Sequence, residues 1–168
     1  MIKEMPVILR KNQRICPLAL RSPLSAAARR YGGAVPPVLL LAAVLVAEEV
    51  SFVLVGSAAL YLHGYLIPVA DIDAVPAPDD GNLARLHAAL AVLVRDGRVP
   101  SIRSLSAADV VSVRTSYGRL DCLLGRGRRD WDRLRDGARQ VRVSDTGVMV
   151  ASAATVTALR RSHKRTMR

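Results

Sequence analysis

The chain has 168 residues, of which 51% are hydrophobic and 4% aromatic, and its formal net charge is +11 at pH 7. This length suits a single domain with a core of Ala, Val and Leu, and it is too short for two. No apolar run reaches the roughly 20 residues of a membrane span and no signal-peptide block stands out, so we expect a soluble cytoplasmic protein without a membrane partner. Cys16 and Cys122 fit no metal-ligand spacing and are expected to be free thiols.

The positive charge is concentrated at the two ends of the chain. Residues 1–33 carry seven basic residues and one acidic residue, and residues 159–168 carry five basic residues and no acid. The segment 34–158 has thirteen residues of each sign. Basic ends favour RNA through contacts with its phosphates. Residues 1–34 are predicted to form a basic, flexible extension, and a solvated arm or sequence upstream of the natural start remain alternatives to RNA binding.

Helices and strands alternate along the rest of the chain. The expected helices cover Val38–Glu49, Ala58–His63 with Ser57 as cap, Asp79 or Asp80 to Arg95, Asp130–Ala138, and a last segment capped by Ser152. The expected strands are Phe52–Val55, Ala70–Ala74, a hairpin of Val110–Ser116 with Arg119–Leu124, and a strand pair within Val141–Val150. Together with a parallel crossover between the first two strands, they predict an α/β or mixed α+β sheet.

The residues that can carry chemistry lie at the end of the first predicted strand and on the second. The apolar strand Phe52–Val55 ends at Gly56 and Ser57, where the start of a helix can bind a phosphate through free N–H groups. Asp71 and Asp73 are two residues apart on the second strand, so both side chains point to one side. Two carboxylates so close are tolerable mainly around a cation, and their oxygen atoms suit Mg²⁺ or Mn²⁺.

Asp121 is the third candidate, because it interrupts an otherwise apolar strand. A charged group in a buried strand needs a cation or a partner. It is expected to bind metal and to activate an attacking hydroxyl group, and two bridging metals would support an in-line displacement. Each motif has an ordinary explanation: Gly-Ser turns are common, Asp-x-Asp is a weak signal, and Asp121 could face solvent. The ordered set is more specific than its parts.

This ordered set resembles the signature of the nucleotidyltransferase-fold superfamily. The sequence is most similar to its AbiEii-like and MenT-like toxin branch over about residues 35–165. The similar segments are Val50–Gly64, Asp71–Asp73, Gly118–Asp121 and Val150–Ser152. The resemblance implies the nucleotidyltransferase (DNA polymerase beta-like) fold in a minimal single domain, with the core at 35–151 and a basic C-terminal helix at 152–168.

The resemblance also implies an activity. Such a protein transfers a nucleoside monophosphate from a nucleoside triphosphate to an acceptor, which in the toxin branch can be the 3′ end of tRNA, and a cognate antitoxin restrains it. Asp71, Asp73 and Asp121 would be the catalytic metal ligands, and Gly56, Ser57 and Arg160 would bind the nucleotide. Arg160 stands where the family has a lysine, and guanidinium groups bind phosphate well.

The chain departs from the family pattern at two places. Pro68-Val69-Ala70 supplies no basic or hydroxyl residue before Asp71. In the last helix Arg165 matches a family arginine, but no acid follows, so this helix is expected to be shortened. Two alternatives therefore stay open: a nucleotidyltransferase acting on a protein or aminoglycoside, or a degenerate module that binds nucleotide or RNA without catalysis.

Other residues are ambiguous in the sequence. His63 is expected to be structural. Arg126, Arg128 and Arg129 follow the Asp121 strand in a segment expected to be a loop, where they would either face solvent or contact a triphosphate or RNA.

Overall fold

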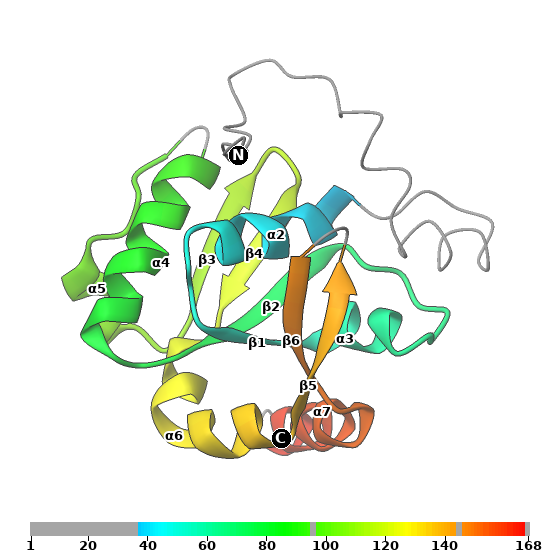
Figure 1. The fold of residues 1–168 in the computed structure, drawn as a ribbon. Helices are drawn as coiled ribbons and strands as arrows, with labels where there is room; N and C mark the ends of the chain where they lie inside the picture. Colours follow the sequence, from blue (N-terminus) through cyan, green and yellow to red (C-terminus); the bar gives the residue numbers. More distant parts are fainter. Residues whose placement is uncertain (1–36, 95–96, 144–145, 167–168) are drawn as a thin grey trace, which may run out of the picture.

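The computed structural model describes residues 37–94, 97–143 and 146–166. They form one six-stranded mixed sheet with helices on both of its faces (Figure 1). The expected mixed α/β architecture is confirmed. The predicted extension at residues 1–34, and Cys16 within it, lie outside the described residues.

The strands follow the order β3-β4-β2-β1-β6-β5 across the sheet. Their bounds are β1 Phe52–Val55, β2 Asp71–Pro76, β3 Val111–Thr115, β4 Gly118–Cys122, β5 Ala138–Val143 and β6 Thr146–Ala151. β2 is parallel to β4 and β1 is parallel to β6, whereas β1 and β2 are antiparallel. The parallel crossover expected between the first two strands is therefore wrong. After the helix that follows β1, the chain is still at the end of the sheet where β1 finishes. β2 therefore starts at that end and runs antiparallel to β1.

The helices divide between the two faces of the sheet. Their bounds are η2 Pro37–Leu39, α2 Leu40–Ala47, α3 Gly56–Leu62, α4 Asp80–Leu93, α5 Ile102–Ala107, α6 Leu124–Asp136 and α7 Ala153–Thr166. α2 and α4 contact each other on one face, and α5 packs on α4. α3, α6 and α7 lie on the opposite face (Figure 1). This second face carries the candidate site.

Helix starts account for most differences from the sequence predictions. α6 begins at Leu124 rather than Asp130. Its start was not predicted because the first turn contains two glycines, which are poor helix formers. α5 was not predicted, since its six residues bury a single leucine, Leu105. The cap at Ser57 is wrong: α3 begins at Gly56 without any side-chain cap. The cap at Ser152 is confirmed, since its hydroxyl oxygen accepts from the N–H of Thr155 at 3.2 Å.

The core is aliphatic, as the composition predicts. The largest fully buried side chains are all Leu, Ile or Val: Leu39, Leu41, Leu45, Leu54, Ile72, Leu86, Leu90, Leu105, Leu120, Leu134, Val53 and Val75. Cys122 is a buried free thiol. No helix in the described part of the chain combines the length and apolarity needed to cross a bilayer.

One buried polar side chain fixes the approach to β1. Asn82 accepts from the N–H of Ser51 at 2.7 Å and donates to the carbonyl oxygens of Ser51 and Ala77, both at 2.9 Å. Its own N–H donates to the cap residue Asp79 at 2.8 Å. The start of α4 is thereby joined to the residue before β1, which holds the central strands in place.

Candidate active site

Three aspartates share one face of the sheet where β2 and β4 run side by side. In the parallel register Asp71 is the partner of Arg119, and Asp73 is the partner of Asp121. Ile72 between the two β2 aspartates is fully buried, as strand alternation requires. The fold therefore brings together two carboxylates of β2 and a third, Asp121, that comes 50 residues after Asp71 in the sequence.

The end of β1 lies directly against the carboxylates of Asp71, Asp73 and Asp121, which together are called the carboxylate group below. Val55 is the partner of Asp73, and the next residue, Gly56, has a φ of 69°, which glycine adopts without strain. A Cβ atom at Gly56 would overlap Oδ2 of Asp73. Ser57 follows in the first turn of α3 and is partly buried. The sequence-predicted Gly-Ser pair and the Asp-x-Asp strand thus meet at one point.

Arg119 joins two of the three carboxylates. Its Nη2 donates to Oδ2 of Asp71, and its Nε lies 3.2 Å from Oδ2 of Asp121. Its side chain is 52% exposed, so the guanidinium group sits at the solvent side of the cluster. Arg119 was not a sequence-predicted site residue, although its two-residue spacing from Asp121 places both on one side of a strand.

The carboxylate group carries more negative charge than its surroundings compensate. The pKa of Asp73 is raised to about 6, mainly by burial and then by the charges of Asp71 and Asp121, while Arg119 and Arg160 act in the opposite direction. An added cation would favour the ionised form of such a carboxylate.

Asp121 has an oxygen atom without a partner. Its side chain is 14% exposed, and its Oδ1 is buried without any hydrogen bond from the described residues. Such an atom is costly unless an ion, a water molecule or a ligand binds it. Among the described residues, however, no three acidic, histidine or cysteine side chains are arranged as ligands of one metal ion. The carboxylate oxygens of the three aspartates are the kind of ligand that a divalent cation prefers. In this structure Arg119 pairs with two of them, Asp71 and Asp121.

Arg160 approaches the same place from α7. This helix packs against α3, and the Arg160 side chain is exposed. Because its positive charge lowers the pKa of Asp73, its guanidinium group is within electrostatic reach of the carboxylates. All six sequence-predicted site residues therefore belong to one region of the fold.

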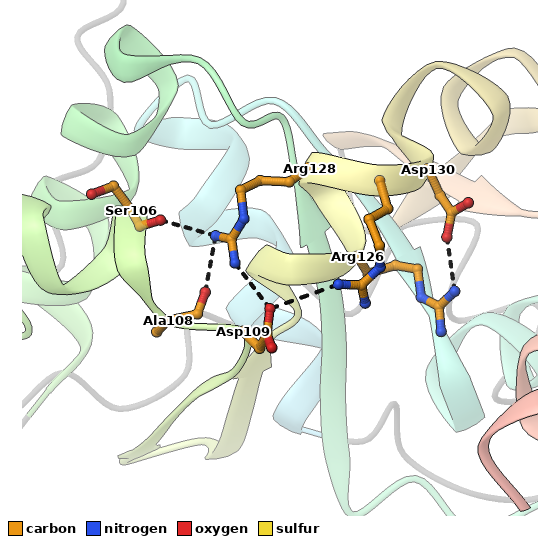
Figure 2. A network of polar contacts seen from close by, with 7 residues as sticks. Ser106, Ala108, Asp109, Arg126, Arg128 and Asp130 are labelled. Carbon is orange, nitrogen blue, oxygen red and sulfur yellow. Dashed lines mark hydrogen bonds and ion pairs between the residues drawn. The ribbon is translucent and has the colours of Figure 1, made fainter. Parts of the chain in front are cut away.

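The arginines of α6 belong to a separate network, which Figure 2 shows. Arg126 bonds Oδ2 of Asp130 at 2.8 Å. Arg128 bonds Oδ1 of Asp109 at 2.9 Å and donates to two backbone carbonyl oxygens at the end of α5. Arg129 lies 3.7 Å from the same Asp109 oxygen. The expectation of a loop here is wrong: Arg128 and Arg129 hold α6 against the segment before β3, whereas Arg126 pairs within α6.

His63 is occupied by structural partners, as expected. Its Nε2 lies 2.7 Å from the carbonyl oxygen of Ala151, and its Nδ1 lies 2.5 Å from Nη2 of Arg139. Because guanidinium can only donate and a carbonyl can only accept, the ring satisfies both contacts as the neutral Nε2–H tautomer. His63 therefore ties the end of α3 to β5 and β6.

Comparison with known proteins gave a match in structure alone. No protein-family model and no curated protein matches the sequence. The fold is similar to the crystal structure of a putative nucleotidyltransferase from Thermotoga maritima, with a TM-score of 0.54 and 16% sequence identity. The similarity covers 86% of this chain and 88% of the other. The sheet with its helices is therefore a nucleotidyltransferase fold.

Proposed function

We propose that this chain is a divalent-cation-dependent nucleotidyltransferase, which transfers a nucleoside monophosphate from a nucleoside triphosphate to an acceptor. One observation carries the proposal: Asp73 and Asp121 are register partners, and Asp121 keeps a buried oxygen unpaired beside them. Such an atom is costly in a purely structural ion-pair network, whereas a bound ligand would satisfy it.

The residues divide into two groups by what they would bind. Asp71, Asp73 and Asp121 would hold Mg²⁺ or Mn²⁺ through oxygen ligands. When bound, such a cation stabilises charge on the reacting phosphoryl group. Gly56 and Ser57 would bind the triphosphate through backbone N–H groups close to Asp73. Arg160 would bind it through its guanidinium group.

The transfer is an in-line displacement at the α-phosphorus. The acceptor hydroxyl oxygen forms a bond to this phosphorus while the bond to the bridging oxygen breaks, and pyrophosphate leaves. Asp121 takes the proton of the acceptor hydroxyl, because its unpaired oxygen is available to accept it. The proton then passes to solvent.

The acceptor we favour is the 3′ end of tRNA, in a toxin restrained by a cognate antitoxin. The basic ends of the chain support a polyanionic acceptor, since lysine and arginine bind phosphate groups in a salt-dependent way. The resemblance of the sequence to the AbiEii-like and MenT-like branch supports the same choice.

Incubation of the full chain with total tRNA, Mg²⁺ and each α-labelled nucleoside triphosphate tests this proposal. We expect label on tRNA from the wild type and none from Asp121→Asn. Asp130→Asn removes a carboxylate from the α6 network instead and should label normally. Label on a protein or an aminoglycoside would replace tRNA as acceptor. The absence of any labelled acceptor, including these two, would overturn the transferase proposal.

One observation favours a second candidate, a module that binds nucleotide without transferring it. Arg119 already pairs with Asp71 and Asp121, so a cation has to displace it. Calorimetric titration with a nucleoside triphosphate distinguishes the two functions. Binding that needs no Mg²⁺ and survives Asp73→Asn would support the non-catalytic module.

A further inference from the structure

A cleft opens beside the carboxylates, at the corner of the sheet formed by β2, β4 and β3. Its volume is about 540 Å³, and it is lined by Ala70, Asp71, Arg114, Thr115, Gly118 and Arg119. Asp71 belongs both to this cleft and to the carboxylate group. A molecule bound in the cleft would therefore reach the proposed reaction centre.

Two arginines stand opposite each other in this cleft. Arg114 on β3 and Arg119 on β4 are register partners in an antiparallel pair, so their side chains share one face. Like charges directly opposite each other are destabilising. Arg119 is compensated by Asp71 and Asp121, but the side chain of Arg114 is exposed and makes no hydrogen bond or ion pair with any residue that the structure describes. An anion bound between them would remove the conflict.

The position of the cleft distinguishes between the two substrates of the proposed reaction. Gly56 and Arg160 approach Asp73 from the side of β1 and α7, where the triphosphate is proposed to bind. The cleft lies on the other side of β2, toward β3. In an in-line displacement the attacking and leaving oxygens lie on opposite sides of the phosphorus. The cleft is thus on the acceptor side.

The wall of the cleft is built to keep its shape. The hydroxyl group of Thr115 donates to the carbonyl oxygen of Gly118 at 2.8 Å and accepts from the N–H of Tyr117 at 3.0 Å. Thr115 also forms an antiparallel bridge with Val94, just after α4. Arg114 therefore extends from a backbone that is fixed on both sides, which lowers the entropy lost when it binds a ligand.

We propose that this cleft binds a backbone phosphate of a nucleic-acid acceptor, with Arg114 as the main contact and Arg119 as the second. The proposal rests on the proposed function and names the residues of that same site that would contact its acceptor. Guanidinium groups suit phosphate because they donate two parallel hydrogen bonds. Uptake of a cation by Asp71 and Asp121 would release Arg119 from its ion pairs, so that both arginines become available to the acceptor.

The test compares two arginines on opposite edges of the sheet. Fluorescence anisotropy measures binding of a labelled short single-stranded RNA to the full chain over a series of salt concentrations. The variants are Arg114→Gln and the matched control Arg142→Gln. Arg142 is exposed on the opposite edge strand β5 and has no ion pair within the described residues. Both variants keep the basic ends and lose one charge, so unspecific attraction is equal.

We expect Arg114→Gln to weaken RNA binding about tenfold at low salt and to reduce the salt slope by about 0.7, the value for one phosphate contact in a single strand. Arg142→Gln should bind nearly as the wild type does. Arg114→Lys should recover part of the loss, because it keeps the charge without the planar fork. Equal losses in Arg114→Gln and Arg142→Gln, with matching thermal melts, would overturn the inference.

A second titration separates the acceptor from the nucleotide. Affinity for a nucleoside triphosphate should be unchanged in Arg114→Gln; a loss confined to the triphosphate would overturn the inference. RNA binding that depends on Arg114 while no labelled product forms leaves the cleft standing and removes the transferase proposal. Conversely, labelled product with the same KM for RNA in Arg114→Gln and Arg142→Gln keeps the transferase and removes the acceptor site.

Discussion

Two groups of acidic and basic side chains lie on the same protein and behave in opposite ways. In the α6 network, Asp109 and Asp130 each have arginine partners, and a hydrogen bond from Arg126 is the main cause that lowers the pKa of Asp130. At the carboxylate group, Arg119 pairs with Asp71 and Asp121 but not with Asp73, and the pKa of Asp73 is raised to about 6.

The difference teaches how to separate structural charge from functional charge. Where the fold supplies enough partners, an ion-pair network holds elements together and needs nothing more. Where it leaves a surplus of negative charge and an unpaired buried oxygen, stability is given up at a place that a ligand can complete. The abundance of arginine near a site is therefore a poor guide, since the arginine-rich helix α6 is the structural one.

The same substitution in each group gives the largest expected contrast. Asp73→Asn should reduce nucleotide transfer by on the order of 10³-fold, because a lost metal ligand removes several kcal/mol of transition-state stabilisation. Asp130→Asn should change the rate less than about twofold, since surface ion pairs contribute little. Initial rates with labelled nucleotide measure both. Comparable losses in the two variants would mean that the contrast between the groups is wrong.

Glycine replacement tests the close packing of the carboxylate group. Gly56→Ala should lower the free energy of unfolding by about 2 kcal/mol or more, because the new Cβ overlaps Oδ2 of Asp73 at a φ of 69°. Gly81→Ala is the matched control: its Cβ would lie 3.4 Å from Oδ1 of Asp79 in the first turn of α4. That substitution should be neutral or stabilising by about 0.5 kcal/mol. Urea denaturation distinguishes the two, and a neutral Gly56→Ala would contradict the close approach.

The pH dependence of stability should reveal the surplus charge. The pKa of Asp73 in the folded state, about 6, is above its ordinary value of 3.8. The folded state therefore binds this proton more tightly, and the contribution of Asp73 to stability falls as pH rises from about 4 to 6. Asp73→Asn lacks this loss, so its stability relative to wild type should increase over that range. Parallel profiles in urea denaturation at several pH values would show that Asp73 is not perturbed.

The smallest expected effect belongs to the α6 network. The pKa of Asp130 is lowered in the folded state, so its contribution is present above the ordinary carboxyl pKa and is lost as pH falls toward the folded value. Asp130→Asn should cost less than about 1 kcal/mol at neutral pH, and the loss should shrink in high salt. Thermal melts at two salt concentrations measure it. A salt-independent loss would mean that packing, rather than charge, is what the residue supplies.

Much of the fold could be predicted because its signals are local. The apolar strand β1 and the Asp-x-Asp alternation follow from neighbouring residues, and the face of α4 follows from helical spacing. The direction of β2 relative to β1 could not be predicted, because it depends on where the chain returns after α3.

The candidate site shows the same limit. Asp121 stands out because an acid interrupts an apolar strand, whereas Arg119 and Arg114 are ordinary strand residues until the register sets them face to face. Arg128 and Arg129 of α6 looked like ligands for phosphate because their partner, Asp109, comes from another segment.

The two outer strands have one more consequence, which concerns self-association. An exposed strand edge offers unpaired N–H and C=O groups to any other strand, and this is a common route to aggregation. β3 carries Arg114, and β5 carries Arg139 and Arg142. Two copies that met edge to edge would bring these positive charges together. This repulsion opposes edge-to-edge pairing of two sheets, and the bridge between Thr115 and Val94 also occupies part of the β3 edge.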